Sequence, residues 1–279
     1  MKRAALINDL SGIGRCSITV ALPIMSALGY ECAVLPTAIL SNHTAFDKFT
    51  FVDFTDNMHE YMDCWQALDA RFDVVYSGFL GSEHQIDITL EFMSRFGKDA
   101  LKVVDPVMGD DGKIYSTCTD ALLSHMRRLV KNADVITPNL TELCVLCGEK
   151  YPQNITLDGV ADLCKRLYEK GPYDIVVTGL ESSVVSDCPQ NKISNLVFEN
   201  GKSVLVSNEK VPFLYCGTGD VFASVLCGVL ANTGSLVKSV KTAADFVETC
   251  TKSTYENGGQ KLFGIQFEDK MHILTELCK

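Results

Sequence analysis

The most constraining feature of the sequence is a regular alternation of short apolar runs with longer amphipathic stretches, which continues to about Gly179. The apolar runs are Ala4–Asn8, Ala33–Leu40, Val74–Ser77, Lys102–Asp105, Val135–Thr137 and Asp174–Thr178, which we interpret as strands. The amphipathic stretches predict helices over Cys16–Leu28, Asp56–Ala70, Glu83–Phe96, Thr119–Val130, Asn139–Cys147 and Leu157–Glu169. Strands and helices that alternate in this way predict a mostly parallel sheet with helices on both faces.

The pattern changes after Gly179. Three more apolar runs lie at Val184–Ser186, Ile193–Phe198 and Ser203–Val206, and Asn200-Gly201 separates the last two. Asn-Gly between alternating residues is typical of a hairpin turn, so we expect a small antiparallel meander late in the chain. Two long helices, Gly219–Leu230 and Leu236–Tyr255, and a short final helix follow. Because no linker or internal repeat interrupts the pattern, the sequence predicts one domain over residues 1–279.

Composition narrows the classes of function. The chain is 47% hydrophobic, which is ample for a core, and its formal net charge is −10 without a run of basic residues. We therefore expect no nucleic-acid partner. The sequence has no apolar run long enough to span a bilayer, and its start does not resemble a signal peptide. These features predict a cytoplasmic protein without a membrane partner.

Twelve cysteines are scattered along the chain. Cys144 and Cys147 form the one CxxC pair, which lies within an expected helix and lacks the second ligand pair that a zinc site needs. The cysteines are therefore expected to be reduced and mostly buried thiols.

Polar, glycine and proline residues follow nearly every expected strand. They are Asn8-Asp9, Ser41–Thr44, Ser77–Phe79, Asp105–Asp110, Thr137–Asn139 and Thr178-Gly179, and the turn-like Ser11–Gly14 lies beside the first of them. Ligands of open parallel sheets bind beyond the carboxyl ends of the strands, which all meet at one edge. We therefore expect these residues to line one extended cleft.

Cys216-Gly217-Thr218-Gly219-Asp220 lies directly before the apolar run Val221–Leu230. Its two glycines allow backbone N–H groups to turn inward at a helix N-terminus, where the helix dipole favours an anion. The alternative is an ordinary turn in which a polar residue caps the helix. The sequence alone leaves both interpretations open.

Acidic side chains follow the middle strands, namely Asp105, Asp110, Asp111 and Glu142. Carboxylates suit Mg²⁺, which keeps several waters and binds substrate phosphates, although Asp111 also fits an ordinary turn. An anion pocket, a carboxylate beside it and an acidic group for Mg²⁺ together indicate phosphoryl transfer. The chain has neither a Gly-x-x-x-x-Gly-Lys-Ser/Thr loop nor a complete Gly-x-Gly-x-x-Gly motif, which disfavours P-loop and Rossmann proteins.

Four motifs, in this order, resemble the ribokinase-like superfamily and, within it, the pyridoxal kinases. They are Ser41–Thr44 (SNHT), Asp105–Asp110 (DPVMGD), Thr137–Glu142 (TPNLTE) and Gly217–Asp220 (GTGD). The resemblance spans essentially the whole chain and implies a three-layer α/β sandwich. It further implies ATP as co-substrate, Mg²⁺ as cofactor and a homodimer, and it leaves open a K⁺ ion near Tyr115.

The resemblance also implies roles for individual residues. Asp220 matches the catalytic base, and Gly217, Thr218 and Gly219 match the backbone that holds the transferred phosphoryl group. The expected metal residues are Asp105, Asp110 and Glu142, the last acting through water. The expected nucleotide contacts are Asp105, Thr137, Asn139, Glu142, Thr178, Lys210 and Thr218, with Glu209–Tyr215 as a flap over the nucleotide. The expected contacts to the vitamin are Asn8, Ser11, His43, Thr44, Phe79 and Asp220.

The first loop departs from the pyridoxal kinase pattern. Those kinases commonly carry Ser-His-Val-Val after the first strand, whereas this chain has Asn-Asp-Leu-Ser-Gly-Ile-Gly. We align Asn8 with the serine that contacts the pyridine ring, and Asp9 or Ser11 could replace that contact. The loop also resembles the Ser-Gly-Gly loop of hydroxymethylpyrimidine kinases, but those relatives usually carry Cys where Asp220 stands and lack SNHT.

We therefore expect an ATP-dependent kinase that phosphorylates the 5′-hydroxymethyl group of pyridoxal, pyridoxine or pyridoxamine. One alternative is hydroxymethylpyrimidine kinase activity, alone or alongside. The other is a catalytically silent relative that binds pyridoxal phosphate or a nucleotide, which the retained Asp220 and Glu142 disfavour.

Overall fold

The computed structural model describes residues 1–116, 118–171 and 174–278, and its centre is a nine-stranded sheet. The strands, in spatial order, are β11 (Lys202–Glu209), β10 (Lys192–Glu199), β9 (Asp174–Leu180), β8 (Val135–Ile136), β5 (Leu101–Val104), β4 (Val74–Ser77), β1 (Lys2–Ile13), β2 (Tyr30–Asn42) and β3 (Phe51–Asp53). The six strands from β9 to β2 are parallel, whereas β10, β11 and β3 add antiparallel edges. The predicted mostly parallel sheet with a late antiparallel meander is therefore confirmed.

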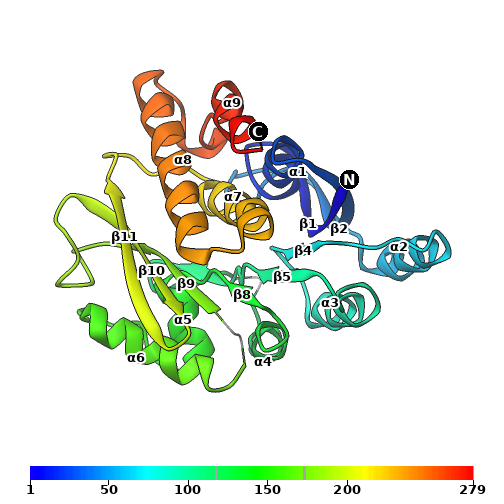
Figure 1. Cartoon of the computed structure of the whole chain (residues 1–279), viewed down its shortest axis with the longest axis horizontal. Helices are drawn as coiled ribbons and strands as arrows, with labels where there is room; N and C mark the ends of the chain where they lie inside the picture. Colours follow the sequence, from blue (N-terminus) through cyan, green and yellow to red (C-terminus); the bar gives the residue numbers. More distant parts are fainter. Residues whose placement is uncertain (117, 172–173, 279) are drawn as a thin grey trace.

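Helices cover both faces of this sheet (Figure 1). One layer contains α2 (Thr55–Ala67), α3 (Glu83–Phe96), α4 (Asp120–Val130), α5 (Leu140–Cys147) and α6 (Leu157–Tyr168), and the other contains α1 (Ser17–Ala27), α7 (Thr218–Thr233), α8 (Leu236–Glu256) and α9 (Met271–Glu276). Side chains alternate along each strand, so Ala5 and Ile7 enter one core while Ala4 and Leu6 enter the other. The result is the expected three-layer sandwich.

The order of the strands defines where a ligand can bind. The chain passes from β1 to β2 on one side and then returns to β4 on the other side of β1. At such a reversal the connections leave in opposite directions, which opens a crevice beyond the carboxyl ends of the two strands. Asn8 and Asp9 lie in the part of β1 that passes the end of β4, and Gly78 directly follows β4.

Three details of the predicted elements differ from the structure. Ser11–Gly14 is not a turn, because β1 continues to Ile13 and pairs with β2 as far as Asn42. Val184–Ser186 is not a strand: it lies in a turn, and Val185 makes a single isolated bridge to Ile155. The short strands β3, β6 (Gly109–Asp110) and β7 (Lys113–Ile114) were not predicted. The hairpin turn at Asn200-Gly201 is confirmed, with φ of +51° and +75°.

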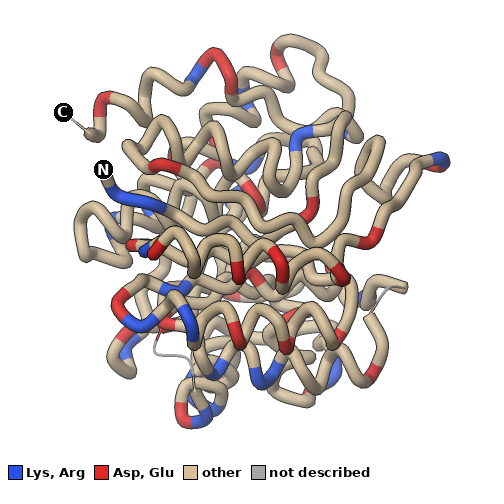
Figure 2. The backbone as a smooth tube through the Cα atoms, turned by 90° about the vertical axis from the view of Figure 1, so that its right-hand side faces the viewer, with Lys and Arg blue, Asp and Glu red and all other residues tan. Residues whose placement is uncertain are grey.

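Six of the twelve cysteines are buried, and these six include Cys144 of the CxxC pair on α5. Over the described ranges of the chain, no helix combines the length and the apolar character needed to cross a membrane. Acidic and basic residues are interspersed over the face shown in Figure 2.

Candidate active site

The N-terminus of α7 is built around Gly217. Its φ is +76°, and a Cβ atom there would lie 1.8 Å from the carbonyl oxygen of Arg15, so both the backbone conformation and the space require glycine. No described side chain caps this end of α7. The first N–H groups of the helix are therefore available to an anion. A Cβ on Gly219 would have no described atom within 4 Å, so the approach to these groups is open.

Asp220 lies in the first turn of the same helix. The pKa of its carboxyl group is raised to about 7, chiefly by burial and to a smaller extent by the nearby carboxylates Asp105 and Asp9. The backbone N–H of Ser17 and the side-chain amide of Asn8 oppose this shift, because donors stabilise the carboxylate. A carboxyl group with a pKa near neutrality can accept a proton from a substrate and release it again.

A second acidic group lies at the ends of β5 and β8. Glu142 is buried, and its two oxygens accept backbone N–H bonds from Met108 at 3.0 Å and Asn139 at 2.9 Å. Asp105 accepts a hydrogen bond from the hydroxyl group of Thr137 at 2.9 Å. Burial raises the pKa of Asp105 to about 6, and burial together with Asp105 and Asp110 raises the pKa of Glu142.

The donor set of this acidic group fits Mg²⁺. The described residues hold no ready-made cluster of three or more metal-binding side chains, and both oxygens of Glu142 are already engaged. Mg²⁺ commonly takes one or two carboxylates and completes its shell with waters and substrate phosphates, so Asp105, Asp110 and Glu142 suit it through such a shell. A cation would also relieve the mutual repulsion that raises the pKa of these groups.

A glutamine at position 142 tests this interpretation. Glu142→Gln removes the charge that would orient metal-bound water, so we expect the Mg²⁺ concentration for half-maximal rate to rise by roughly tenfold. Glu149→Gln, which removes an exposed acid that pairs with Arg166, is the matched control. Glu142 is also the capping-box residue of α5. If Glu142→Gln has an unchanged Mg²⁺ titration and only a lower melting temperature, this structural role is its only one.

Asn8, Asp9 and Ser11 lie in β1 and are all buried, and the first two lie near the Asp220 carboxylate. Asn8 is 1% exposed, and its Oδ1 accepts N–H bonds from Phe79 at 2.9 Å and Asp9 at 3.0 Å, whereas its Nδ2 has no described partner. Ser11 has no exposed surface and donates to Asp9 at 2.9 Å. Ser11 therefore supports Asp9 in this structure, and the buried side-chain amide of Asn8 lies beside the Asp220 carboxylate.

The other residues expected to contact the vitamin lie in the segments that follow β2 and β4. Thr44 is exposed, and Phe79 is partly exposed at the end of β4. His43 is fixed by its Nε2, which lies 2.6 Å from the carbonyl oxygen of Leu262, and its ring packs against Gly14. The loop after β2 is thus tied to the segment before α9.

The expected nucleotide residues lie at the ends of β8 and β9. The Asn139 side chain accepts from the N–H of Glu142 at 3.0 Å and donates to Gly109 at 2.7 Å, so its described role is to shape this loop. Thr178 is partly exposed, and its backbone N–H donates to Pro138 at 2.9 Å. Lys210 follows β11 and forms an ion pair with Glu181. Tyr115 lies near the acidic group, whose charges help raise its pKa.

Two residues that the sequence did not indicate also reach this site. Glu181 directly follows β9 and helps raise the pKa of Asp110, and Lys261 lowers it. Glu181 could have been found by the same strand-end rule that identified Asp105. Lys261 lies in a segment far along the chain that returns to the site, where its carbonyl oxygen accepts a hydrogen bond from the N–H of Cys216 at 3.1 Å. Nothing local in the sequence indicates that return.

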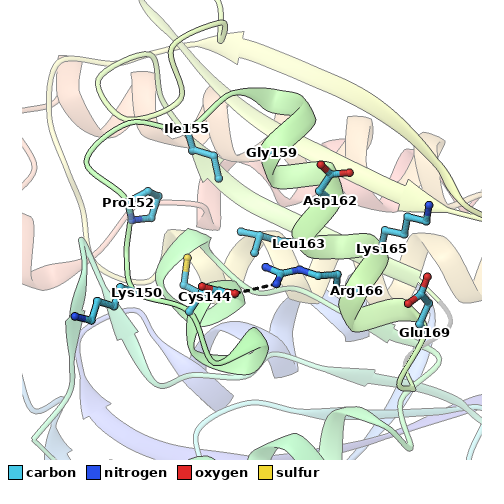
Figure 3. A pocket seen from close by; sticks show the side chains of 11 residues that line it. Cys144, Lys150, Pro152, Ile155, Gly159, Asp162, Leu163, Lys165, Arg166 and Glu169 are labelled. Atoms are coloured by element: carbon cyan, nitrogen blue, oxygen red, sulfur yellow. Dashed lines mark hydrogen bonds and ion pairs between the residues drawn. The ribbon is translucent and has the colours of Figure 1, made fainter.

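A cavity of about 680 Å³ between α5 and α6 is separate from these residues. Its lining includes Cys144, Ile155 and Leu163, and Arg166 pairs with Glu149 at 2.8 Å beside it (Figure 3). None of the predicted site residues lines this cavity. The candidate active site is therefore the one at the strand ends and at the N-terminus of α7.

Known proteins share both the sequence and the fold. The pyridoxal kinase PdxY of Granulibacter bethesdensis is 27% identical over 260 residues, which cover 91% of this chain and 89% of that protein. The thiamine biosynthetic bifunctional enzyme TH1 of Arabidopsis thaliana is 30% identical over 85% of this chain and 44% of its own length. A Bacteroides thetaiotaomicron protein assigned as a phosphomethylpyrimidine kinase and crystallised with pyridoxal is 38% identical, with a TM-score of 0.91 over 98% of this chain and 95% of that one.

These similarities confirm the expected resemblance to pyridoxal kinases and the assignment as a kinase. The family model described as phosphomethylpyrimidine kinase matches residues 22–263, which include Asp105, Glu142 and Asp220. The match covers most of the chain and extends over both helical layers. The chain therefore belongs to the phosphomethylpyrimidine kinase family.

Proposed function

We propose that this protein phosphorylates the 5′-hydroxymethyl group of pyridoxal, pyridoxine or pyridoxamine with ATP. The observation that carries the proposal is Asp220, a carboxylate with a pKa near 7, in the first turn of a helix whose N-terminal N–H groups are open to an anion. This arrangement puts a proton acceptor beside a site for a phosphoryl group. The relative crystallised with pyridoxal supports the choice of acceptor.

The reaction requires one bond to form and one to break. The substrate hydroxyl oxygen attacks the γ-phosphorus, the bond from that phosphorus to the β–γ bridging oxygen breaks, and ADP leaves. Asp220 accepts the hydroxyl proton as the new bond forms, since an alcohol is too weak an acid to lose it earlier. The N–H groups of Thr218 and Gly219 stabilise the charge on the transferred group. Mg²⁺, held by Asp105, Asp110 and Glu142, would neutralise phosphate charge.

The acceptor would lie between the later part of β1, which contains Asn8, and the loop after β2. Thr44 would supply a hydroxyl and Phe79 an aromatic face, and the Nδ2 of Asn8, which is buried beside Asp220, would donate to a ring substituent or nitrogen. The nucleotide would lie on the opposite side, near Thr137, Thr178 and Lys210, with Glu209–Tyr215 as the flap. We further propose a cytoplasmic homodimer, on the basis of the family resemblance.

Thr44→Ala tests the acceptor side. Loss of one polar contact typically costs about 0.5–1.5 kcal/mol, so KM for pyridoxal should rise by roughly threefold to tenfold while KM for ATP stays unchanged. Thr275→Ala, an exposed threonine on α9, is the matched control and should change neither constant. A rise in KM for ATP alone would place this loop on the nucleotide side and contradict the proposed arrangement.

Hydroxymethylpyrimidine is the second candidate acceptor. The family description and the similarity to the thiamine enzyme favour it, and the first loop resembles that of such kinases. Steady-state rates with pyridoxal, pyridoxine, pyridoxamine and hydroxymethylpyrimidine separate the two candidates. We expect the highest kcat/KM for a B6 vitamer, and a higher value for hydroxymethylpyrimidine would reverse the assignment.

A further inference from the structure

Ser17, the first residue of α1, has an unusual backbone conformation. Its φ is +51°, in the left-handed region that residues other than glycine, asparagine and aspartate rarely occupy. The residue is buried, with 7% of its surface exposed. A strained backbone at a buried position persists only where its surroundings hold it, and such positions are concentrated at functional sites.

Ser17 makes two interactions in this conformation. The Ser17 hydroxyl donates to Oδ1 of Asp9 at 2.5 Å, and the second oxygen of Asp9 accepts the hydroxyl of Ser11 at 2.9 Å. The backbone of Arg15 and Cys16, directly before Ser17, lies against Gly217 at the start of α7, and the backbone N–H of Ser17 is among the groups that lower the pKa of Asp220. Ser17 thus joins a buried carboxylate on β1 to the carboxylate at the start of α7.

The segment before Ser17 is firmly packed. The carbonyl oxygen of Arg15 lies directly against Gly217, where even a Cβ atom would come within 1.8 Å of it. On its other side, Arg15 donates to the carbonyl of Phe263 at 3.0 Å and pairs with Glu268 at 2.6 Å. Because Arg15 is held between α7 and the segment before α9, the N–H of Ser17 has a defined position relative to Asp220.

We propose that Ser17 is a positioning residue for the base: its hydroxyl bond to Asp9 holds the left-handed backbone, and that backbone presents its N–H to Asp220. Asp220 is thereby fixed in the orientation in which it receives the substrate proton. The inference rests on the proposed function, because it requires Asp220 to act as the base. A geometric error at a reacting group lowers turnover more than it lowers binding.

Ser17→Gly is the direct test. Glycine adopts a φ of +51° without strain and keeps the backbone N–H, so the variant should fold while losing only the hydroxyl tether. Losing a hydrogen bond to a charged group is expected to lower kcat by about tenfold, with KM for ATP and for pyridoxal within about twofold of wild type. Asn200→Gly is the matched control, because it relieves the same kind of backbone strain at the exposed hairpin turn and should leave kcat unchanged.

Two substitutions of Asp9 provide a second test. Asp9→Asn keeps an oxygen that can accept the Ser17 hydroxyl, so kcat should stay within about threefold of wild type, whereas Asp9→Ala should lower it by about tenfold. Wild-type kcat in either Ser17→Gly or Asp9→Ala would overturn the inference. Wild-type protein that transfers no phosphate would instead refute the proposed function, so the two failures are distinguishable.

Discussion

Replacing Asp220 with asparagine should lower kcat by roughly 10²-fold or more, while ATP binding is retained. Asparagine preserves the size of the side chain but cannot accept the substrate proton. The helix N-terminus, built by Gly217, remains available to the nucleotide phosphates. The measurement is steady-state turnover with pyridoxal, together with nucleotide affinity from titration calorimetry. Near wild-type turnover would remove Asp220 from the chemistry.

The same substitution should affect stability in a defined direction. The pKa of Asp220 in the folded protein, about 7, is above its ordinary value of 3.8, so the folded chain binds this proton more tightly than the unfolded chain. The stabilisation associated with that proton is present below about pH 4 and is lost as the pH rises through about 7. The substituted amide does not titrate, so the melting temperature of Asp220→Asn relative to wild type should increase between about pH 4 and about pH 7. A simple helix-capping role predicts a less stable variant at neutral pH.

Gly217→Ala is expected to have the second large effect. The added Cβ would come within 1.8 Å of the Arg15 carbonyl oxygen at a φ of +76°, so the start of α7 must move. We expect a destabilisation of about 2–3 kcal/mol and, since the N–H groups that hold the phosphoryl group move with it, a fall in kcat of roughly 10²-fold. Thermal melts and turnover of the purified variant measure the two effects.

Gly219→Ala is the matched control for stability in this experiment. A Cβ at Gly219 meets no described atom within 4 Å, and alanine favours the helix, so its melting temperature should be unchanged or slightly higher. Gly217→Ala with both the stability and the turnover of wild type would contradict the assigned geometry of the anion pocket.

Local sequence patterns predicted the helices and most strands because their signals are short-range. The Glu83–Phe96 helix begins after Ser82, which accepts the N–H of Gln85 at 3.2 Å, and α5 begins with a capping box between Asn139 and Glu142. The strand-end rule selected the candidate site residues in the same way, because the ends of parallel strands meet at one edge of the sheet. Asp105 helps raise the pKa of both Glu142 and Asp220, as that rule leads one to expect.

Features that depend on pairing between distant segments were missed. Ser11–Gly14 has the composition of a turn, but β2 continues beside it and extends β1 to Ile13. The three residues of β3 are all exposed, so they carry no buried pattern, and Val184–Ser186 is apolar without a neighbouring strand to pair with. The left-handed backbone of Ser17 is likewise set by its packing against Arg15 and Asp9 rather than by its own residue type.

Transfer of the terminal phosphate of labelled ATP to pyridoxal tests the central claim most directly. The purified protein, ATP labelled at the γ-phosphate and Mg²⁺ are incubated with pyridoxal and, in parallel reactions, with pyridoxine and pyridoxamine. The products are separated, and Asp220→Asn is the control. The account predicts labelled pyridoxal 5′-phosphate with wild type and at least about 10²-fold slower labelling with the variant. Wild-type protein that binds pyridoxal and ATP but transfers no label to any of the three vitamers would contradict it.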